Sequence, residues 1–396
     1  MDATLRLPEG FRISTVSAGL AAPERPDLLL ILADEACPAS AVFTTNQVIA
    51  APVALCREHM RLNRGLVRAI LANSGSANSC TGPEGDQDAM QCAAWIAERL
   101  GCPTEEVLLF STGVIGQRLE IDRIEDSLDE LFEGLTLDPG AIDSAARAIM
   151  TTDMVPKIGH GSVPLDAEED GCILGLAKGS GMIHPQMATM LAFFLTDIDP
   201  SALSADFVLR AVVGETFHHV SVDGDGSTND SVLLWSSRKR KETEEAGDRF
   251  LRTFEEVASD LARAIARDGE GASKLIVVEV RQAISSRQAV ECGRTIAGSL
   301  LVKTAVHGED PNWGRILAAA GRSGVNMNTR KLRVGIGPAC LFENDRPRPE
   351  NEALAREHMK GEEVLIWIEL AAGDSEACFY GCDLSADYVR INADRS

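Results

Sequence analysis

A threonine at position 189 lies between two kinds of sequence that together could make its hydroxyl a nucleophile. The segment 178–181 (KGSG) before it is small and flexible, and the apolar run 190–195 after it is typical of a buried strand. A threonine hydroxyl reacts once a base takes its proton, and a free α-amino group on the same residue can be that base. Freeing that amine requires the Thr189 hydroxyl to attack the Ala188 carbonyl and break the Ala188–Thr189 bond. By spacing alone, a threonine in this position is more often an ordinary structural residue.

The composition of the chain argues against several classes of protein. The sequence has 396 residues, of which 45% are hydrophobic and 25% charged, so it can bury a large core and is expected to form more than one lobe. Its net charge of −22 argues against nucleic acid and against an anionic membrane as partners. The ten cysteines are dispersed without a CxxC pair, which is typical of reduced thiols in the cytoplasm. We expect no signal peptide, because the first residues form no apolar stretch.

The residue pattern predicts neither a metal site nor a resident cofactor. The histidines form no cluster with the spacing of metal ligands. The segment 223–226 (DGDG) begins like a calcium loop, but such a loop requires glycine at its sixth position and glutamate at its twelfth. Counted from Asp223, these positions hold Thr228 and Leu234, so we interpret the segment as a structural loop.

Strand and helix patterns alternate along the chain, which predicts an α/β or mixed α+β fold with at least one mixed sheet. Strands are predicted at residues 41–53, 66–73, 106–111, 190–195, 275–280, 332–336, 364–370 and 377–382, with two more around the turn at 223–226. Helices are predicted at residues 86–100, 121–135, 203–217, 248–267 and 286–303. The polar, glycine-containing segment 157–171 is predicted to be a mobile surface segment, and the basic run 238–241 an exposed hairpin or loop.

Eight sequence blocks together resemble those of one enzyme family. The segment 178–191 (KGSGMIHPQMATML) resembles the self-processing motif of the ornithine acetyltransferase (bifunctional glutamate N-acetyltransferase) family. Further blocks look like that family's in the same order: AVFTTNQVIAAPV (41–53), ILANSGSANSCTG (70–82), STGVIG (111–116), DGDGSTND (223–230), DGEGASKL (268–275), LVKTAVHGEDPNWGRI (301–316) and YGCDLSADYVRIN (380–392). They span nearly the whole chain, which makes chance a poor explanation. The resemblance implies sheets layered between helices, with Thr189 deep in a central cleft.

The resemblance also implies the residues of the active site. Thr189 is then the nucleophile, and Ala188–Thr189 is the bond that is cleaved. Thr112, through its hydroxyl, and Gly113, through its backbone N–H, form the oxyanion hole. The substrate-binding residues are Thr152, Lys178, Thr189, Glu270, Asn392 and Ser396. Within such a set, a lysine suits the carboxylate of an amino-acid substrate and a glutamate suits its amine.

The activity that the resemblance implies is acetyl transfer in arginine biosynthesis, in the cytoplasm. The precursor cuts itself into an alpha chain, residues 1–188, and a beta chain, residues 189–396, which assemble as a heterotetramer of two alpha and two beta chains. Thr189 takes the acetyl group from N2-acetylornithine, and glutamate then takes it from the acetyl-Thr189 ester. Some members of the family also use acetyl-CoA as the donor and others do not, and no residue in this sequence decides between them.

Two other functions remain open. An N-terminal-nucleophile aminopeptidase or amidase of related fold would share the cut and the nucleophile but would pass the acyl group to water. A non-catalytic binding or scaffold protein would keep the fold alone. The joint presence of Thr112, Gly113, Lys178, Thr189 and Glu270 argues against the scaffold. The blocks 178–183 and 268–275 favour the transferase over the hydrolase.

Overall fold

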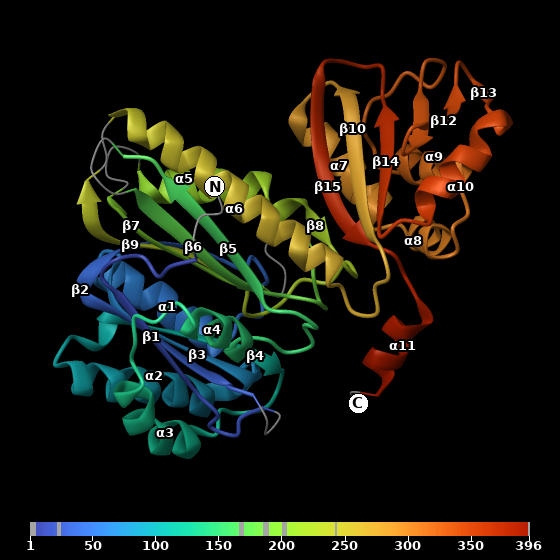
Figure 1. Cartoon of the computed structure of the whole chain (residues 1–396). Coiled ribbons are helices and arrows are strands. Elements are labelled where there is room, and N and C mark those ends of the chain that lie inside the picture. Colours follow the sequence, from blue (N-terminus) through green and yellow to red (C-terminus); the bar gives the residue numbers. More distant parts are fainter. Residues whose placement is uncertain are drawn as a thin grey trace. The chain divides into compact units, whose positions relative to one another are not determined.

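The computed structural model of the chain describes residues 5–21, 25–165, 170–184, 190–199, 204–241 and 244–394. The chain forms two compact units, and each is described by itself (Figure 1). The first unit comprises Met1–Gly179, Gln186–Phe217 and Gly226–Leu261. The second comprises Ser180–Pro185, His218–Asp225 and Ala262–Ser396.

The first unit is built on a mixed sheet with the strand order β4-β3-β2-β9-β7-β6-β5, and β1 pairs with β2. Its strands are β1 (Phe11–Val16), β2 (Leu28–Phe43), β3 (Leu66–Ser76), β4 (Val107–Val114), β5 (Lys157–Val163), β6 (Gly171–Lys178), β7 (Leu191–Asp199) and β9 (Ser231–Lys241). The long strand β2 joins two halves of this sheet, because residues 28–32 pair with β3 and residues 39–43 pair with β9.

The two halves of the sheet pack face to face and helices cover the outer faces. Aromatic pairs connect the halves: Phe110 of β4 lies 4.9 Å, between ring centroids, from Phe193 of β7, and Phe11 of β1 lies 4.9 Å from Trp235 of β9. The helices of this unit are α1 (Ala51–Leu62), α2 (Gly82–Leu100), α3 (Ile121–Glu133), α4 (Ala141–Ala148), α5 (Ala205–Glu215) and most of α6 (Glu244–Arg267). Helices α2 and α3 cover β2–β4, and α6 covers β5–β7.

The second unit contains another mixed sheet, with the order β13-β12-β11-β14-β10-β15-β8. Its strands are β8 (Val220–Ser221), β10 (Leu275–Ala283), β11 (Arg333–Ile336), β12 (Ala339–Glu343), β13 (Arg346–Pro347), β14 (Glu363–Glu369) and β15 (Ser375–Cys382). Its helices are α7 (Ser286–Ala297), α8 (Leu300–His307), α9 (Trp313–Gly321), α10 (Glu352–Met359) and α11 (Ala386–Ala393). One apolar core lies between this sheet and helices α7–α10.

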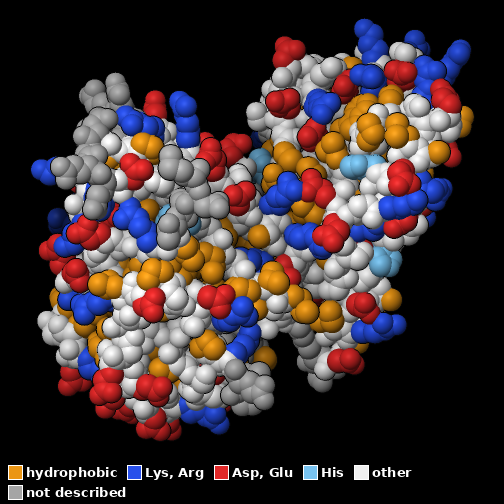
Figure 2. Space-filling view, viewed as in Figure 1, with side chains coloured by type: hydrophobic (Ala, Val, Ile, Leu, Met, Phe, Trp, Pro, Cys, Tyr) orange, Lys and Arg blue, Asp and Glu red, His pale blue; other side chains and the backbone are white. Residues whose placement is uncertain are grey.

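The observed architecture confirms the predicted fold class, which is mixed α/β with sheets layered between helices. Helices α2 and α3 lie within a few residues of their predicted bounds, and Gly101 ends α2 in the left-handed conformation, with φ 63°. Charged side chains of both signs are interspersed over the molecular face drawn in Figure 2. In the described part of the chain, no helix is both long and apolar enough to cross a membrane.

The predicted strand at residues 41–53 is wrong over most of its length. Strand β2 ends at Phe43, and helix α1 begins at Ala51 with Pro52 in its first turn. Proline is favoured there because its missing N–H would have no partner in the first turn of a helix. The apolar residues after position 49 therefore belong to a helix that packs on β4.

The predicted mobile segment at residues 157–171 is wrong over residues 157–163, which form strand β5, whereas residues 166–169 of the segment lie outside the described residues. Its glycines serve packing and not mobility. A Cβ atom on Gly159 would lie 2.7 Å from Val257, and one on Gly161 would lie 2.2 Å from Thr253. Both contacts are with α6, so glycine lets this helix pack directly on the strand.

Two further boundaries differ from their prediction. The basic run 238–241 is the end of strand β9, where Arg238 pairs with Asp199 and Arg240 with Asp197. The predicted helix 286–303 is two helices, α7 and α8, because the chain turns at Gly298 and Ser299. The first error arises because the partners of the basic run are distant in the sequence. The second arises because a single glycine interrupts a strong helical pattern.

Candidate active site

Four strands of the first unit bring their ends together at one edge of the sheet. Lys178, the last residue of β6, pairs with Leu191, the first residue of β7. Leu191 pairs with Ser231, the first residue of β9, and Ser231 pairs with Phe43, the last residue of β2. Met190 follows Thr189 directly, so the predicted nucleophile is bonded to this edge. Thr189 itself lies outside the described residues, as do Ala188 and Ser396.

A buried lysine connects this edge to the end of strand β4. Lys178 is 1% exposed, and its Nζ donates hydrogen bonds to Thr112 Oγ1 at 3.2 Å and to Thr151 Oγ1 at 2.8 Å. The structure therefore brings together two predicted site residues, Lys178 and Thr112. The threonine that contacts the lysine in the segment 151–153 is Thr151, whereas the predicted Thr152 is a half-buried neighbour on the same bend.

Asp153 neutralises this buried lysine and was not predicted as a site residue. Its carboxylate lies 4.0 Å from Lys178 Nζ, 2.7 Å from Lys157 Nζ and accepts the Gly179 N–H at 2.7 Å. Burial opposes the charged form of Asp153, but the charges of the two lysines and the hydrogen bonds prevail and lower its pKa from 3.8 to about 2. The carboxylate thus stays charged and lies between the two buried lysines as their counter-ion.

This depressed pKa predicts a loss of stability in acid. A carboxyl whose pKa is lower in the folded state stabilises the fold above pH 3.8, and that contribution disappears as the pH falls towards 2. We expect Asp153 to contribute about 2 kcal/mol to the free energy of unfolding at pH 5 and close to none at pH 2. Denaturant unfolding of wild type and Asp153→Asn across this range measures the difference.

Asp143 offers a matched control for the acid measurement. It forms an exposed ion pair with Arg147 on helix α4, and such pairs contribute little to stability. Asp143→Asn is therefore expected to unfold with the wild-type dependence on pH. A parallel pH dependence for wild type and Asp153→Asn would contradict the role given to the buried carboxylate.

The backbone conformation at Gly113 and the close packing around it admit only glycine at this position. Gly113 has φ 139°, and a Cβ atom there would lie 2.2 Å from the carbonyl carbon and oxygen of Gly75, its partner on strand β3. The side chain of Asn229 donates to the carbonyl of Ser111 at 2.9 Å, which fixes the strand just before Thr112. The end of strand β4 thus holds the predicted oxyanion-hole pair, Thr112 and Gly113, in a defined backbone conformation.

In the second unit, the structure brings together the predicted residues Glu270 and Asn392. Glu270 is 6% exposed, and its Oε2 accepts a hydrogen bond from Asn392 Nδ2 at 2.8 Å. The backbone N–H of Glu270 donates to the Ser180 carbonyl at 3.1 Å. A Cβ atom on Gly181 would lie 2.3 Å from the Glu270 carboxyl carbon, so the glycine makes room for that carboxylate.

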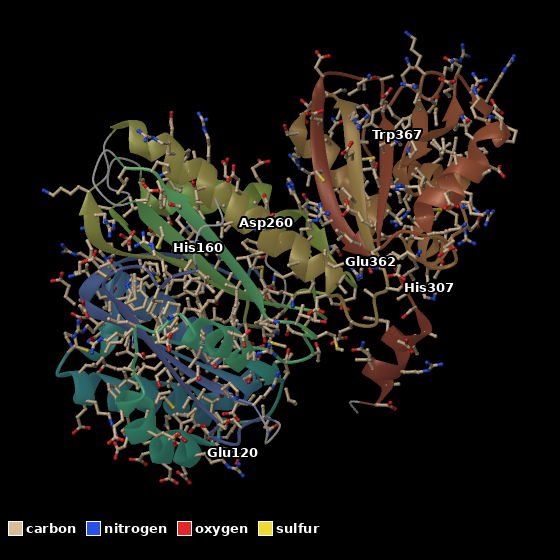
Figure 3. The ribbon with its side chains drawn as sticks, viewed as in Figure 1. Glu120, His160, Asp260, His307, Glu362 and Trp367 are labelled. Atoms are coloured by element: carbon tan, nitrogen blue, oxygen red, sulfur yellow. The ribbon has the colours of Figure 1, made fainter. Side chains whose placement is uncertain are left out.

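A buried aspartate anchors the loop that carries Glu270. Asp383 Oδ1 accepts the backbone N–H groups of Ser273 and Lys274, both at 2.8 Å, and Oδ2 contacts Ser273 Oγ at 2.6 Å and His307 Nδ1 at 2.7 Å. Burial opposes the anion, but these hydrogen bonds lower the pKa of Asp383. Ser273 and His307 (labelled in Figure 3) both contact Oδ2 of Asp383 and do not form a nucleophile–base pair with each other. Asp383 therefore serves as an anchor for the loop.

The segment 223–226 is a structural loop, as predicted. Asp223 accepts the backbone N–H groups of Met182 at 2.6 Å and Ile183 at 2.9 Å, so it holds the segment that leads to the predicted cleavage site. Burial raises the pKa of Asp223, and the hydrogen bonds from these N–H groups oppose the rise. Among the residues that the structure describes, no group of three histidine, cysteine or acidic side chains could hold a metal ion.

The fold is mixed α/β, and the sequence comparisons identify the enzyme family to which the chain belongs. Residues 12–396 match the sequence profile of the ArgJ family, and the chain belongs to that family. This confirms the resemblance found in the sequence blocks.

Similar proteins come from bacteria and archaea. "Arginine biosynthesis bifunctional protein ArgJ" of Synechocystis sp. is 42% identical, over 100% of this chain and 98% of that protein. "Glutamate N-acetyltransferase" of Methanopyrus kandleri is 41% identical, over 98% of this chain and 99% of that protein. The crystal structure of "Arginine biosynthesis bifunctional protein argJ" from Bacillus halodurans is 41% identical, with a TM-score of 0.49, and covers 52% of this chain and 100% of that chain.

Proposed function

We propose that the chain is a self-cleaving enzyme that moves an acetyl group from N2-acetylornithine to glutamate through an ester on Thr189. The class of enzyme follows from the family: the chain is a glutamate N-acetyltransferase of arginine biosynthesis. The observation that supports the proposed site best is the contact of the buried Lys178 with Thr112 at the sheet edge to which Thr189 is bonded. We infer a cytoplasmic location, where amino acids are made.

The proposed reaction has two acyl transfers. In the first, the Thr189 amine takes the proton of the Thr189 hydroxyl, and the Oγ atom forms a bond to the acetyl carbonyl carbon of N2-acetylornithine. The C–N bond of N2-acetylornithine then breaks, and the Thr189 amine gives the proton to the leaving nitrogen. In the second, the glutamate amine attacks the acetyl ester, the ester C–O bond breaks, and Thr189 regains its proton. Each transfer passes through a tetrahedral oxyanion, which needs hydrogen-bond donors.

The contacts of Thr112 support its place in the oxyanion hole. Its hydroxyl oxygen accepts a hydrogen bond from Lys178 Nζ, so the hydroxyl proton is available to donate to another oxygen. The positive charge beside the hydroxyl also makes it a stronger donor. Gly113 would supply the second donor through its backbone N–H. We assign both residues to stabilisation of the oxyanion.

Lys178 and Glu270 are the proposed charged groups for the substrate. Lys178 would meet the carboxylate of the amino acid and Glu270 the amine of ornithine, because each is a buried group of the opposite charge. Asn392 holds the Glu270 carboxylate by its hydrogen bond. Thr152 and Ser396 complete the proposed set.

The sheet topology supports a stable association of the two proposed pieces, residues 1–188 and 189–396. Strands β7 and β9 come from the second piece and lie between β2 and β6, which come from the first. The cut would therefore leave two strand pairings between the pieces here, β2 with β9 and β6 with β7. Two such cut chains would form the proposed heterotetramer.

A product assay tests the transferase against the hydrolase. The cut protein is incubated with N2-acetylornithine, with and without glutamate, and the products are separated. We expect N-acetylglutamate and ornithine in equal amounts when glutamate is present. Acetate as the main product in its presence would favour an amidase, and replacement of N2-acetylornithine by acetyl-CoA tests the second donor.

Gly181→Ala is expected to weaken substrate binding without unfolding the protein. The new methyl group would meet the Glu270 carboxylate, which sits at the end of a flexible side chain and can move. We expect the KM for N2-acetylornithine to rise about tenfold, corresponding to about 1.4 kcal/mol of lost binding, with an unchanged Tm. Gly214→Ala is the control, because a Cβ atom on Gly214 meets no atom within 4 Å in the described structure. An unchanged KM for Gly181→Ala would argue against Glu270 as a substrate ligand.

A further inference from the structure

Asp230 is a buried carboxyl group at the sheet edge to which Thr189 is bonded. It directly precedes strand β9, its side chain is fully buried, and its backbone oxygen accepts the Thr44 N–H at 2.9 Å. Its Oδ1 accepts the backbone N–H of Met190 at 3.1 Å. That amide nitrogen belongs to the peptide bond between residues 189 and 190. Asp230 therefore binds the peptide group that carries the Thr189 carbonyl.

The second carboxyl oxygen of Asp230 lacks a donor in the described part of the chain. Among the residues that the structure describes, Oδ2 is buried and has no hydrogen-bond partner. A buried polar atom without a partner is costly, and in native proteins it needs an explanation. A group that exists only after the chain is cut, and that donates hydrogen bonds, would provide one.

We propose that Asp230 binds and orients the α-amino group that self-cleavage creates on Thr189. This inference rests on the proposed cleavage at Ala188–Thr189. Three covalent bonds, about 4.3 Å in total length, separate the Thr189 amine nitrogen from the amide nitrogen that Asp230 Oδ1 already holds. Asp230 is thus a positioning residue: it fixes the base that takes the hydroxyl proton, and its charge stabilises the ammonium group that forms in that step.

The charged surroundings of Asp230 agree with this role. Burial raises the pKa of Asp230 well above 3.8, while the hydrogen bond from the Met190 N–H, the nearby polar groups of Ser227 and the charge of Lys178 oppose the rise. Lys178 ends strand β6, which is separated from β9 by β7; Asp153 lies beside this lysine and in turn pairs with Lys157. An ammonium group next to Asp230 would favour its charged form, and the carboxylate in turn would raise the pKa of the amine.

Asp230→Asn removes the charge but keeps an oxygen that can accept the Met190 N–H. The variant is therefore expected to fold and to be cut. Its kcat should fall about tenfold or more because the ammonium group loses its counter-ion, while the KM for N2-acetylornithine stays near the wild-type value. The acid limb of its pH–rate profile should move to lower pH by about one unit, because the amine loses a neighbouring negative charge.

Asp197→Asn is the matched control, because Asp197 is another fully buried aspartate of the same sheet. Asp197 accepts the Cys172 N–H at 2.9 Å and pairs with Arg240, so its loss should lower stability without moving the pH–rate profile. Titration of the wild-type Thr189 amine by competitive labelling with dinitrofluorobenzene gives a second readout that needs no variant. We expect its pKa to lie above the ordinary range of about 7.7–8.0.

The outcomes separate this inference from the proposed function. An uncut wild-type chain would overturn the proposed cleavage itself. A cut and active wild type whose amine titrates at or below the ordinary range, or an Asp230→Asn variant with the wild-type kcat and pH–rate profile, would overturn the role of Asp230 and leave the cleavage standing. A shift of the profile in Asp230→Asn, with none in Asp197→Asn, supports the inference.

Discussion

Replacing Thr189 with alanine is expected to leave a single uncut chain of 42.4 kDa and to abolish acetyl transfer. The proposed cut and the proposed transfer use the same hydroxyl, so the loss of one oxygen atom removes both. Removal of a nucleophile typically costs at least about 10⁴-fold in rate. Denaturing electrophoresis and the N-acetylglutamate assay measure the two effects on one preparation.

Thr189→Ser provides the matched control, because serine keeps the hydroxyl. This variant is expected to be cut and to retain measurable transfer. If Thr189→Ala were cut like the wild type, another residue would have to be the nucleophile for processing. If it were uncut but still formed N-acetylglutamate at the wild-type rate, the acetyl-threonine intermediate would be wrong.

Thr112→Val is expected to reduce kcat for acetyl transfer about 10²–10³-fold, the usual effect of removing one oxyanion-hole donor. The variant keeps the shape of the side chain, and the residue is 2% exposed, so the change is confined to the loss of the hydroxyl. Because the oxyanion forms in the transition state, KM should change much less than kcat. Steady-state kinetics with N2-acetylornithine and glutamate measures both constants.

Thr151→Val distinguishes the loss of an oxyanion-hole donor from the loss of a hydrogen bond that holds Lys178. Thr151 also accepts a hydrogen bond from Lys178 Nζ, at 2.8 Å, but it has no assigned part in the oxyanion hole. If Thr112 acts only by holding Lys178, the two valine variants will lose activity equally. We expect Thr151→Val to lose less than about tenfold, because Thr112 and Asp153 still hold the lysine and limit the effect of one lost hydrogen bond.

The parts of the fold that the sequence predicted well are those with strong local periodicity. Helix α3 repeats apolar residues at helical spacing, and strands β7 and β10 are short apolar runs, so each could be identified from neighbouring residues alone. Strand β5 was missed because its glycines are explained by a helix about a hundred residues later, where Gly161 faces Thr253. No local rule distinguishes such a glycine from one in a loop.

In the candidate site, too, some residues were predicted from the sequence and others were missed. Thr112, Lys178, Glu270 and Asn392 were predicted from the family blocks, and the structure gives the Lys178–Thr112 and Glu270–Asn392 contacts. Asp153 was missed, although a lysine four residues later at position 157 was a signal for an ion pair.

Asp230 was missed for a different reason. It contacts Met190 only because two parallel strands, β7 and β9, start side by side. A single sequence gives no measure of that register, so an acidic residue before a strand reads as part of a turn. The roles of Asp153 and Asp230 both depend on the burial of their side chains, which the sequence does not show.

Amino-terminal sequencing of the purified wild-type protein tests the central claim most directly. Self-cleavage at Ala188–Thr189 predicts two amino termini in equal amounts, one of which reads Thr-Met-Leu-Ala. A single amino terminus on a 42.4 kDa chain that nevertheless forms N-acetylglutamate would contradict the account.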